Sequence, residues 1–330
     1  APPLELADVS DLRLGVALGK AVVTVKGSVL GGQANVTASS PSINSADLPV
    51  TTPFAKPVEF KNVQLTADMK GQNARLTNLS FVLFDGSAKA QAALVMGVAA
   101  PPFSGTVTLQ GVQLGPVLDA LGSTALSVSG TARANLSVKG RGFSMPDLTR
   151  ALEGSGHLGA KDGRIEGVNL VQEAVTLFNV AGIPLDNAKA TVFATAETDF
   201  AVKQGIIAVQ KLLLNSREFQ ATGGGTIGFD QTLNLNVNLN LSPSLSQRIA
   251  ASSPVVKLAL HEGRLRLPLT VTGTAQNPSY GLDMKGLTAK AQEQVREKAK
   301  ETVKGLLEGT TTPEDLHQQG KELLKGLFGH

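Results

Sequence analysis

The stretch Leu233-Asn234-Leu235-Asn236-Val237-Asn238-Leu239-Asn240-Leu241 alternates five aliphatic residues with four asparagines. Successive side chains of a β-strand point to opposite faces, so this segment would have one apolar face and one polar face. Asparagine is a poor strand former, so the conformation must be held by neighbouring strands rather than by local propensity. The stretch therefore predicts a strand inside a larger sheet.

The same two-residue period recurs along most of the chain. It is found in Leu12–Leu18, Leu65–Met69, Leu79–Leu83, Ala90–Leu94, Ala134–Val138, Ala188–Ala194 and Leu265–Val271. Gly, Asn and Asp separate these runs, as in Phe84-Asp85-Gly86 and Lys161-Asp162-Gly163, which we interpret as hairpin turns. The pattern predicts a mainly β protein built from one long, curved antiparallel sheet.

Short helices are expected to interrupt the sheet. The segments concerned are 115–121, 145–152, 169–180 and 245–251, and the first two carry Pro near the first helical position. A G-V-Q-L step at 111–114 and a G-V-N-L step at 167–170 each lead into one of these helices. Both steps predict a strand that turns directly into a helix.

The last 45 residues differ in character from the rest. Apolar residues fall at helical spacing from Leu287 to Leu307 with charged residues between them, and a second helix is expected after Thr312. We expect a division into 1–123 (the N-terminal part of a β-groove), 124–285 (its C-terminal region, with the helix at 169–180) and 286–330 (an amphipathic helical tail). The tail could pack over an open end of the sheet, lie on a membrane surface or bind a partner protein.

The composition excludes several classes of protein. Of the 330 residues, 17% are charged, against about 25% in an average soluble domain, and none is Cys or Trp. Without Cys there is neither a disulfide scaffold nor a thiolate metal site. Aromatic residues make up 4% and the net charge is +3. Both values argue against a protein that binds nucleic acid by stacking aromatic side chains on the bases. Four histidines offer little for acid–base catalysis, and we expect no enzyme activity.

The small motifs do not support a cofactor or a metal. Two segments match G-x-G-x-x-G, at 154–159 and 223–228, but neither has the strand before it and the helix after it that a dinucleotide site requires. Glycine in turns, bulges or curved strands explains both. His157 with Asp162 could form an acid–base or metal pair, but we interpret them as a strand residue and a hairpin-turn residue. His261 with Glu262 is interpreted as another turn.

A one-sided apolar sheet must be covered by a second sheet, by a helix or by lipid. The inward residues would be Leu, Val, Ala and Phe, and the outward residues Asn, Thr, Ser and Gln. If lipid covers the face, the best lining candidates are those of the two most regular strands: Leu233, Leu235, Val237, Leu239, Leu241, Leu265, Leu267, Leu269 and Val271.

Two segments resemble the C-terminal region of the AsmA family. Residues 152–170 show a glycine-spaced strand, a D-G turn, a short strand and a G-V-N-L entry into a helix. Residues 267–280 are similar to the closing strand and N-P-S-Y turn of that family. Residues 79–94 and 103–114 fit its N-terminal rhythm of strands, so that the resemblance spans about residues 10–285.

The resemblance implies an envelope protein with an aliphatic β-groove, like TamB and the chorein-type lipid bridges. Such a protein would be periplasmic, tethered to the inner membrane, and would carry phospholipids between the inner and outer membranes without catalysis. The alternative is a structural or outer-membrane assembly factor that acts by protein–protein docking. The expected partners are phospholipids and, through the helical tail, a membrane surface or an envelope protein. No anchoring helix is visible and the chain opens with Ala1, so we expect the native protein to be longer.

Overall fold

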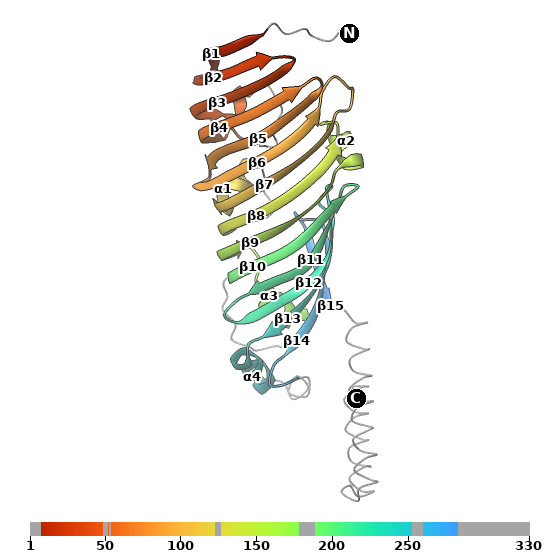
Figure 1. Cartoon of the computed structure of the whole chain (residues 1–330). Coiled ribbons are helices and arrows are strands. Elements are labelled where there is room, and N and C mark those ends of the chain that lie inside the picture. The colour runs from red at the N-terminus through yellow and green to blue at the C-terminus, as the bar shows by residue number, and fades with distance from the viewer. Residues whose placement is uncertain are drawn as a thin grey trace, which may run out of the picture.

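The protein folds into a single open sheet of fifteen antiparallel strands, in which every strand pairs with its neighbours in sequence (Figure 1). The structure is a computed structural model that describes residues 8–48, 52, 54–122, 127–177, 189–252 and 260–282. The strands are β1 (Val9–Leu18), β2 (Ala21–Leu30), β3 (Gln33–Asn44), β4 (Glu59–Lys70), β5 (Asn73–Leu83), β6 (Gly86–Val95), β7 (Pro102–Gln113), β8 (Val128–Arg141), β9 (Glu153–Glu166), β10 (Ala190–Lys203), β11 (Ile206–Asn215), β12 (Phe219–Gly228), β13 (Leu233–Leu241), β14 (Arg266–Gly273) and β15 (Pro278–Leu282). The mainly β, long and curved antiparallel sheet predicted from the sequence is confirmed.

The alternating stretch forms β13 with the predicted separation of faces. Its register sets Leu239 opposite Ala221 of β12 and Leu267 of β14, so that apolar side chains of three strands share one side. The asparagines point to the other side, and Asn234, at the start of the strand, is exposed. We call the apolar side of the whole sheet the inner face and the polar side the outer face.

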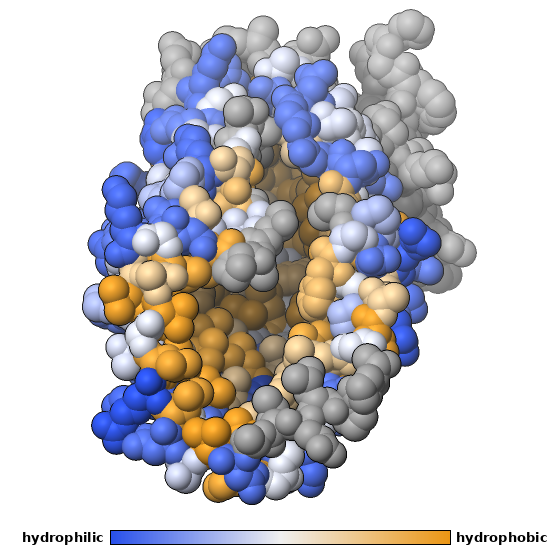
Figure 2. All heavy atoms as spheres, turned by 90° about the horizontal axis from the view of Figure 1, so that it is seen from above, coloured by the Kyte–Doolittle hydropathy of each residue, from blue (hydrophilic) through white to orange (hydrophobic). Residues whose placement is uncertain are grey.

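Irregular residues bend the strands. Register shifts occur around Gly111 of β7 and around Gly130 of β8, whose φ angles of 71° and 126° favour glycine. Such bulges increase the local bend and twist of a strand. The sheet forms a trough, and Figure 2 shows apolar residues lining the hollow with hydrophilic residues around the outside.

The D-G turns give two different outcomes. Phe84 and Asp85 have φ angles of 47° and 61° and form the predicted tight turn between β5 and β6. Glu262 and Gly263 form a second tight turn, closed by the bridge between His261 and Arg264. Asp162 also has a positive φ, 51°, but it lies within β9, so the hairpin turn expected there is wrong and the residue marks an irregularity inside one long strand.

The helices divide the long edges of the sheet into two rims. The connections β3–β4, β7–β8, β9–β10 and β13–β14 lie on one rim, which we call the helical rim. They hold a short 3-10 helix (Ser45–Asp47), α1 (Leu114–Ala120), α3 (Leu170–Leu177) and α4 (Pro243–Ser252). The opposite turn rim has mostly short hairpins, with α2 (Met145–Ala151) in its β8–β9 connection (Figure 1). Each of the four predicted helices corresponds to one of α1–α4. The predicted end of the third helix and all of the tail, 286–330, lie outside the described residues.

Both G-V-x-L steps form the predicted strand-to-helix transitions. Gly111 and Gly167 have φ angles of 71° and 86°, and α1 and α3 begin at the Leu three residues later. Asn169 accepts a hydrogen bond from the backbone N–H of Gln172 (3.1 Å), which caps α3.

The main packed core lies at strands β10–β14, which we call the lower part of the trough after its place in Figure 1, and it is packed against the helical rim. Side chains of α3 and α4 cover the inner face of β10–β14 there, and Leu245 and Ile249 of α4 are fully buried. The hydroxyl of Ser246 accepts a hydrogen bond from the backbone N–H of Leu265 (2.9 Å), which ties α4 to the chain entering β14. A second, smaller cluster packs Phe54, Phe60, Phe81 and Phe84 over β4 and β5 at the same rim. The helices thus fill only one side of the trough.

The division expected at 123/124 falls in the β7–β8 connection. The two flanking strands pair directly, so the sheet continues across that point. The division into regions remains a prediction.

Candidate functional site

One row of inner-face residues runs through the whole sheet. The strand registers set one residue of each strand directly opposite the next, from the first strand to the last. We call this set the central row: Leu14, Val25, Ala38, Leu65, Leu79, Ala90, Val107, Leu136, Gly156, Phe200, Val209, Gly225, Leu235, Val271 and Tyr280. Before Tyr280 it contains no polar side chain.

The central row remains accessible along its full length. None of its fifteen members is buried, and Leu14 of the first strand, β1, is 49% exposed. The helices of the helical rim therefore leave this row uncovered. An apolar surface that crosses fourteen strands and that protein leaves partly uncovered is the candidate binding site.

The neighbouring outer row has the opposite character. From β2 to β11 the registers align Thr24, Ser39, Gln64, Ser80, Lys89, Thr108, Asn135, His157, Asp199 and Gln210. Each member is polar, and each lies one residue from a member of the central row. The sheet therefore separates apolar from polar side chains over ten consecutive strands.

The ion pairs of this part of the sheet lie on the outer face. Arg133 and Glu197 meet at 2.6 Å across Gly159, and Nδ1 of His157 lies 2.9 Å from a carboxylate oxygen of Asp199. These side chains are roughly one-third to two-thirds exposed, so each pair contributes little to stability. His157 is therefore a strand residue, as the sequence indicated, and its partner is Asp199 rather than Asp162.

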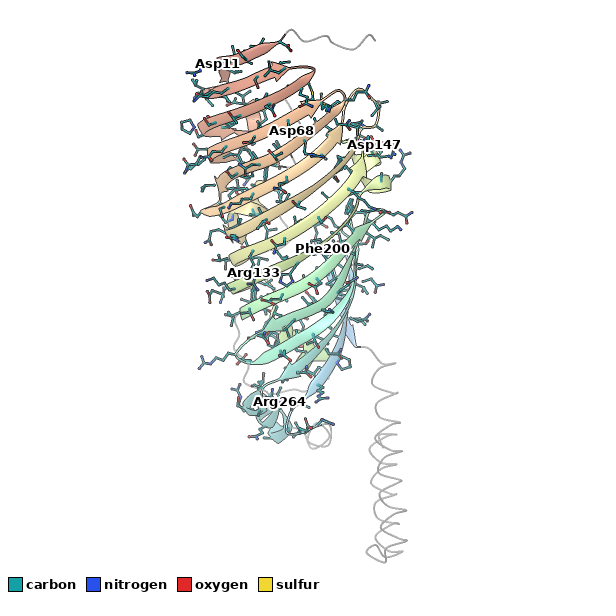
Figure 3. The ribbon with its side chains drawn as sticks, in the orientation of Figure 1. Asp11, Asp68, Arg133, Asp147, Phe200 and Arg264 are labelled. Atoms are coloured by element: carbon teal, nitrogen blue, oxygen red, sulfur yellow. The ribbon has the colours of Figure 1, made fainter. Side chains whose placement is uncertain are left out.

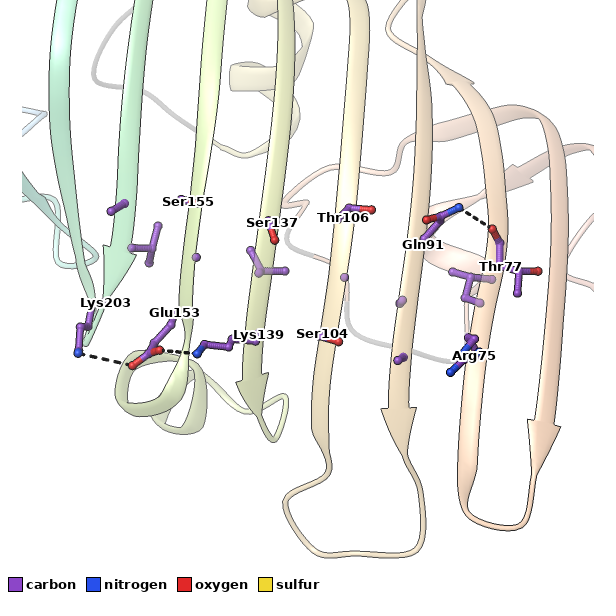
Figure 4. Close-up of a pocket in the computed structure, with 18 residues that line it drawn as sticks. Arg75, Thr77, Gln91, Ser104, Thr106, Ser137, Lys139, Glu153, Ser155 and Lys203 are labelled. Carbon is purple, nitrogen blue, oxygen red and sulfur yellow. Dashed lines mark hydrogen bonds and ion pairs between the residues drawn. The ribbon is translucent and has the colours of Figure 1, made fainter.

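A shallow furrow of about 790 Å³ crosses the outer face of β5–β10. Figure 4 shows the polar side chains that border it, which belong to two outer-face rows, with Lys139 and Lys203 paired to Glu153. The hydrogen bond from Lys139 is the main cause that lowers the pKa of the Glu153 carboxyl. The furrow is open, it is bordered by both polar and apolar side chains, and it lies on the face of the sheet opposite to the central row.

Chemistry of other kinds has little support in the described part of the chain. No group of three or more His, Asp or Glu side chains is placed to hold a metal ion there. The two glycine-rich motifs lie inside β9 and β12, where Gly156 and Gly225 belong to the central row. A Cβ at Gly156 would lie 2.8 Å from the ring of Phe200, so the glycine makes room for an aromatic side chain and not for a phosphate.

The nine lining residues predicted from the sequence all belong to the lower part of the trough. Leu235 and Val271 face each other in the central row, and Leu233 is also partly accessible. The other six are buried by the protein itself, in the core that α3 and α4 complete: Val237, Leu239, Leu241, Leu265, Leu267 and Leu269. Contact of any of the nine with lipid remains a prediction, and the accessible surface extends through the strands before β13.

Sequence reasoning missed most of the central row because it ranked strands by regularity. Leu65, Leu79 and Leu136 lie in runs with the same two-residue period, although register shifts at Thr66/Ala67 and at Leu76/Leu79 interrupt that period around two of them. The signal was present but weaker, and only the register shows which members of each run align across strands.

No helix among the described residues has both the length and the apolar composition needed to cross a bilayer. Searches of curated proteins and of solved structures returned no match. The family model of the AsmA family matches residues 55–212, which extend from just before β4 into β11 and include the central row from Leu65 to Val209. The resemblance inferred from the sequence is thus confirmed over residues 55–212, which match the AsmA family.

Proposed function

We propose that this protein binds phospholipids and transfers them along the central row. The observation that carries the proposal is the row itself, which is apolar in fourteen strands and is not buried by protein in any of them. The match of residues 55–212 to the AsmA family, which is generally associated with the cell envelope, supports the same conclusion.

The physical basis is burial of acyl chains on the inner face. Each methylene removed from water contributes about 0.8 kcal/mol, so two acyl chains need no strong polar contact to be held. The headgroups would stay in water at the mouth of the trough. Because no polar side chain interrupts the row before Tyr280, an acyl chain can move along it without crossing a large energy barrier.

No catalytic step is required by this mechanism. The finer parts of the proposal are a periplasmic location, a tether to the inner membrane and transfer between the inner and outer membranes. They are supported by the resemblance to AsmA proteins, which are not known as enzymes. The expected partners remain phospholipids and an envelope protein or a membrane surface.

The decisive experiment compares two adjacent residues of β8. Leu136→Asp sets a carboxylate in the central row, whereas Ser137→Asp sets the same group on the exposed outer face one residue later. We expect the first variant to lose transfer of fluorescent phospholipid between vesicles and to carry less co-purified lipid in native mass spectrometry, while the second behaves as the wild type in both assays. Circular dichroism establishes that both variants are folded.

Equal lipid binding by both folded variants would contradict the proposal. A wild-type protein that carries no lipid after gentle extraction from membranes, and takes up none, would also contradict it. That result would favour the alternative of an assembly factor that acts by protein docking, whose activity Leu136→Asp should leave intact.

A further inference from the structure

The turn rim has a cluster of exposed apolar residues at two neighbouring connections, whereas its β2–β3 and β10–β11 hairpins carry one exposed large apolar residue each, Leu30 (53%) and Ile206 (48%). The cluster comprises the β6–β7 connection, with Met96 and Val98 exposed at 44% and 46%, and the start of the β8–β9 connection, with Phe143 exposed at 61%. Phe143 stacks on Phe103 of β7 with ring centroids 5.1 Å apart. We call Met96, Val98, Phe103 and Phe143 the lip patch.

The backbone holds the two connections together. The N–H of Gly142 donates to the carbonyl of Pro101 (3.0 Å), and the N–H of Met96 donates to the carbonyl of Gln72 in the neighbouring hairpin (2.7 Å). In Figure 4 the β6–β7 connection is the wide loop below the ends of the strands that carry Gln91 and Ser104. The exposed side chains are therefore presented by a braced loop at the edge of the sheet.

The lip patch is continuous with the central row. On β7 the inner-face residues Val107, Gly105 and Phe103 lead from the row to the rim, and on β8 Leu136 and Val138 do the same. Phe103 is only partly buried, so its ring connects the inner face with exposed Phe143. An acyl chain would meet no polar side chain along this path.

Cationic residues outnumber acidic ones beside the lip patch. Lys70 and Arg75 border a furrow of about 520 Å³ that also contacts Phe103, and Arg141 lies two residues before Phe143. Asp68 of β4, labelled in Figure 3, borders the same furrow opposite Arg75, but within the described residues none of the three cations forms an ion pair. Of the other nearby acids, Glu153 is held by two lysines. The side chain of Asp147 is bonded to Ser144. Exposed aromatic and aliphatic residues beside unpaired cations are typical of surfaces that bind anionic lipid headgroups.

We propose that the lip patch docks on the surface of a lipid bilayer, so that acyl chains enter the central row sideways over the turn rim. Val98 and Phe143 insert among the headgroups, and Lys70, Arg75 and Arg141 contact lipid phosphates. The direction of entry rests on the proposed function, whereas docking itself does not.

The absence of cysteine allows site-specific labelling of the full chain. Val98→Cys and Phe143→Cys carry a polarity-sensitive fluorophore, and Val192→Cys, at a position 55% exposed on the outer face of β10, is the matched control. With vesicles of phosphatidylcholine and phosphatidylglycerol, we expect a blue shift at 98 and 143, and quenching by brominated acyl chains. The label at 192 should remain in water.

The unlabelled double variant Val98→Asp/Phe143→Asp should bind these vesicles at least about tenfold more weakly than Val192→Asp, because two apolar side chains no longer enter the bilayer. If the protein sediments with vesicles while the label at 98 stays in water, another part of the chain binds the membrane and the proposal is wrong. Lipid uptake with no shift at 98 overturns docking alone. A shift at 98 in a wild-type protein that takes up no lipid supports docking and counts against the proposed function.

Discussion

Two leucine-to-alanine substitutions on the inner face should differ sharply in cost. Leu239 of β13 is 0% exposed and belongs to the core that α3 and α4 complete, whereas Leu158 of β9 is 37% exposed on the same face. Leu239→Ala removes buried methylenes and leaves a cavity, so we expect it to lower the free energy of unfolding by about 2–5 kcal/mol. Leu158→Ala removes atoms that water already reaches and encloses no cavity, so its cost should be about 1 kcal/mol or less.

Urea unfolding measures both effects. Tyr280 lies in β15 and is the single tyrosine of a chain without tryptophan. Its fluorescence therefore reports unfolding of the C-terminal end of the sheet, while circular dichroism reports unfolding of the whole sheet. The Tyr280 transition should move to lower urea in Leu239→Ala and change little in Leu158→Ala. Bound phospholipid should increase the cost of Leu158→Ala, because an acyl chain then packs against that side chain.

Equal costs for the two substitutions in lipid-free protein would refute the reasoning. Equal costs would mean that the inner face at β9 is packed as tightly as the core that α3 and α4 complete. A cost at Leu158 that does not change with lipid, in protein shown to carry lipid, would exclude this residue from the binding surface.

Two further predictions concern single side chains of the lower sheet. Gly163→Ala should lower the free energy of unfolding by about 1–3 kcal/mol in urea, because the added Cβ would lie 2.0 Å from the buried ring of Phe193, and Phe193→Leu in the same chain should recover part of the loss. Burial raises the pKa of Tyr280 above 10.0, so its absorbance titration should have a midpoint above that value. Because the unfolded chain then releases its proton first, stability should fall as pH rises above 10, and Tyr280→Phe should remove this contribution from the unfolding curve.

Alternation predicted the strands well because one face of this sheet is mainly polar and the other is mainly apolar. The run Leu233–Leu241 shows the principle, since its leucines and asparagines separate as predicted. The same run misled the choice of lining residues, because alternation reports a face and not what covers it. Leu245 and Ile249 of α4 bury Leu239 together with Leu241, and nothing in the local sequence of β13 records that contact.

Local turn signals were reliable only where tertiary packing agreed with them. Asp85-Gly86 and Asp162-Gly163 are the same dipeptide, and both aspartates adopt a positive φ. The first lies at a hairpin end and the second in the middle of β9, where Gly163 leaves room for the ring of Phe193 on the adjacent strand. That requirement comes from a residue thirty positions later in the chain, so a window of a few residues cannot detect it.

The topology explains why so little chemistry is needed for the proposed activity. Fifteen strands spaced about 4.8 Å apart give a central row roughly 70 Å long, whereas the hydrocarbon of one bilayer leaflet is about 15 Å deep. Several acyl chains could therefore lie end to end along the row, and each would contact only a few strands. Because every strand pairs only with its neighbours, the length of the row follows from the number of hairpins, and its apolar character from one residue per strand. A path built in this way is a series of similar contacts, so a single charged residue in any strand would interrupt passage along it while leaving apolar surface on both sides able to bind lipid.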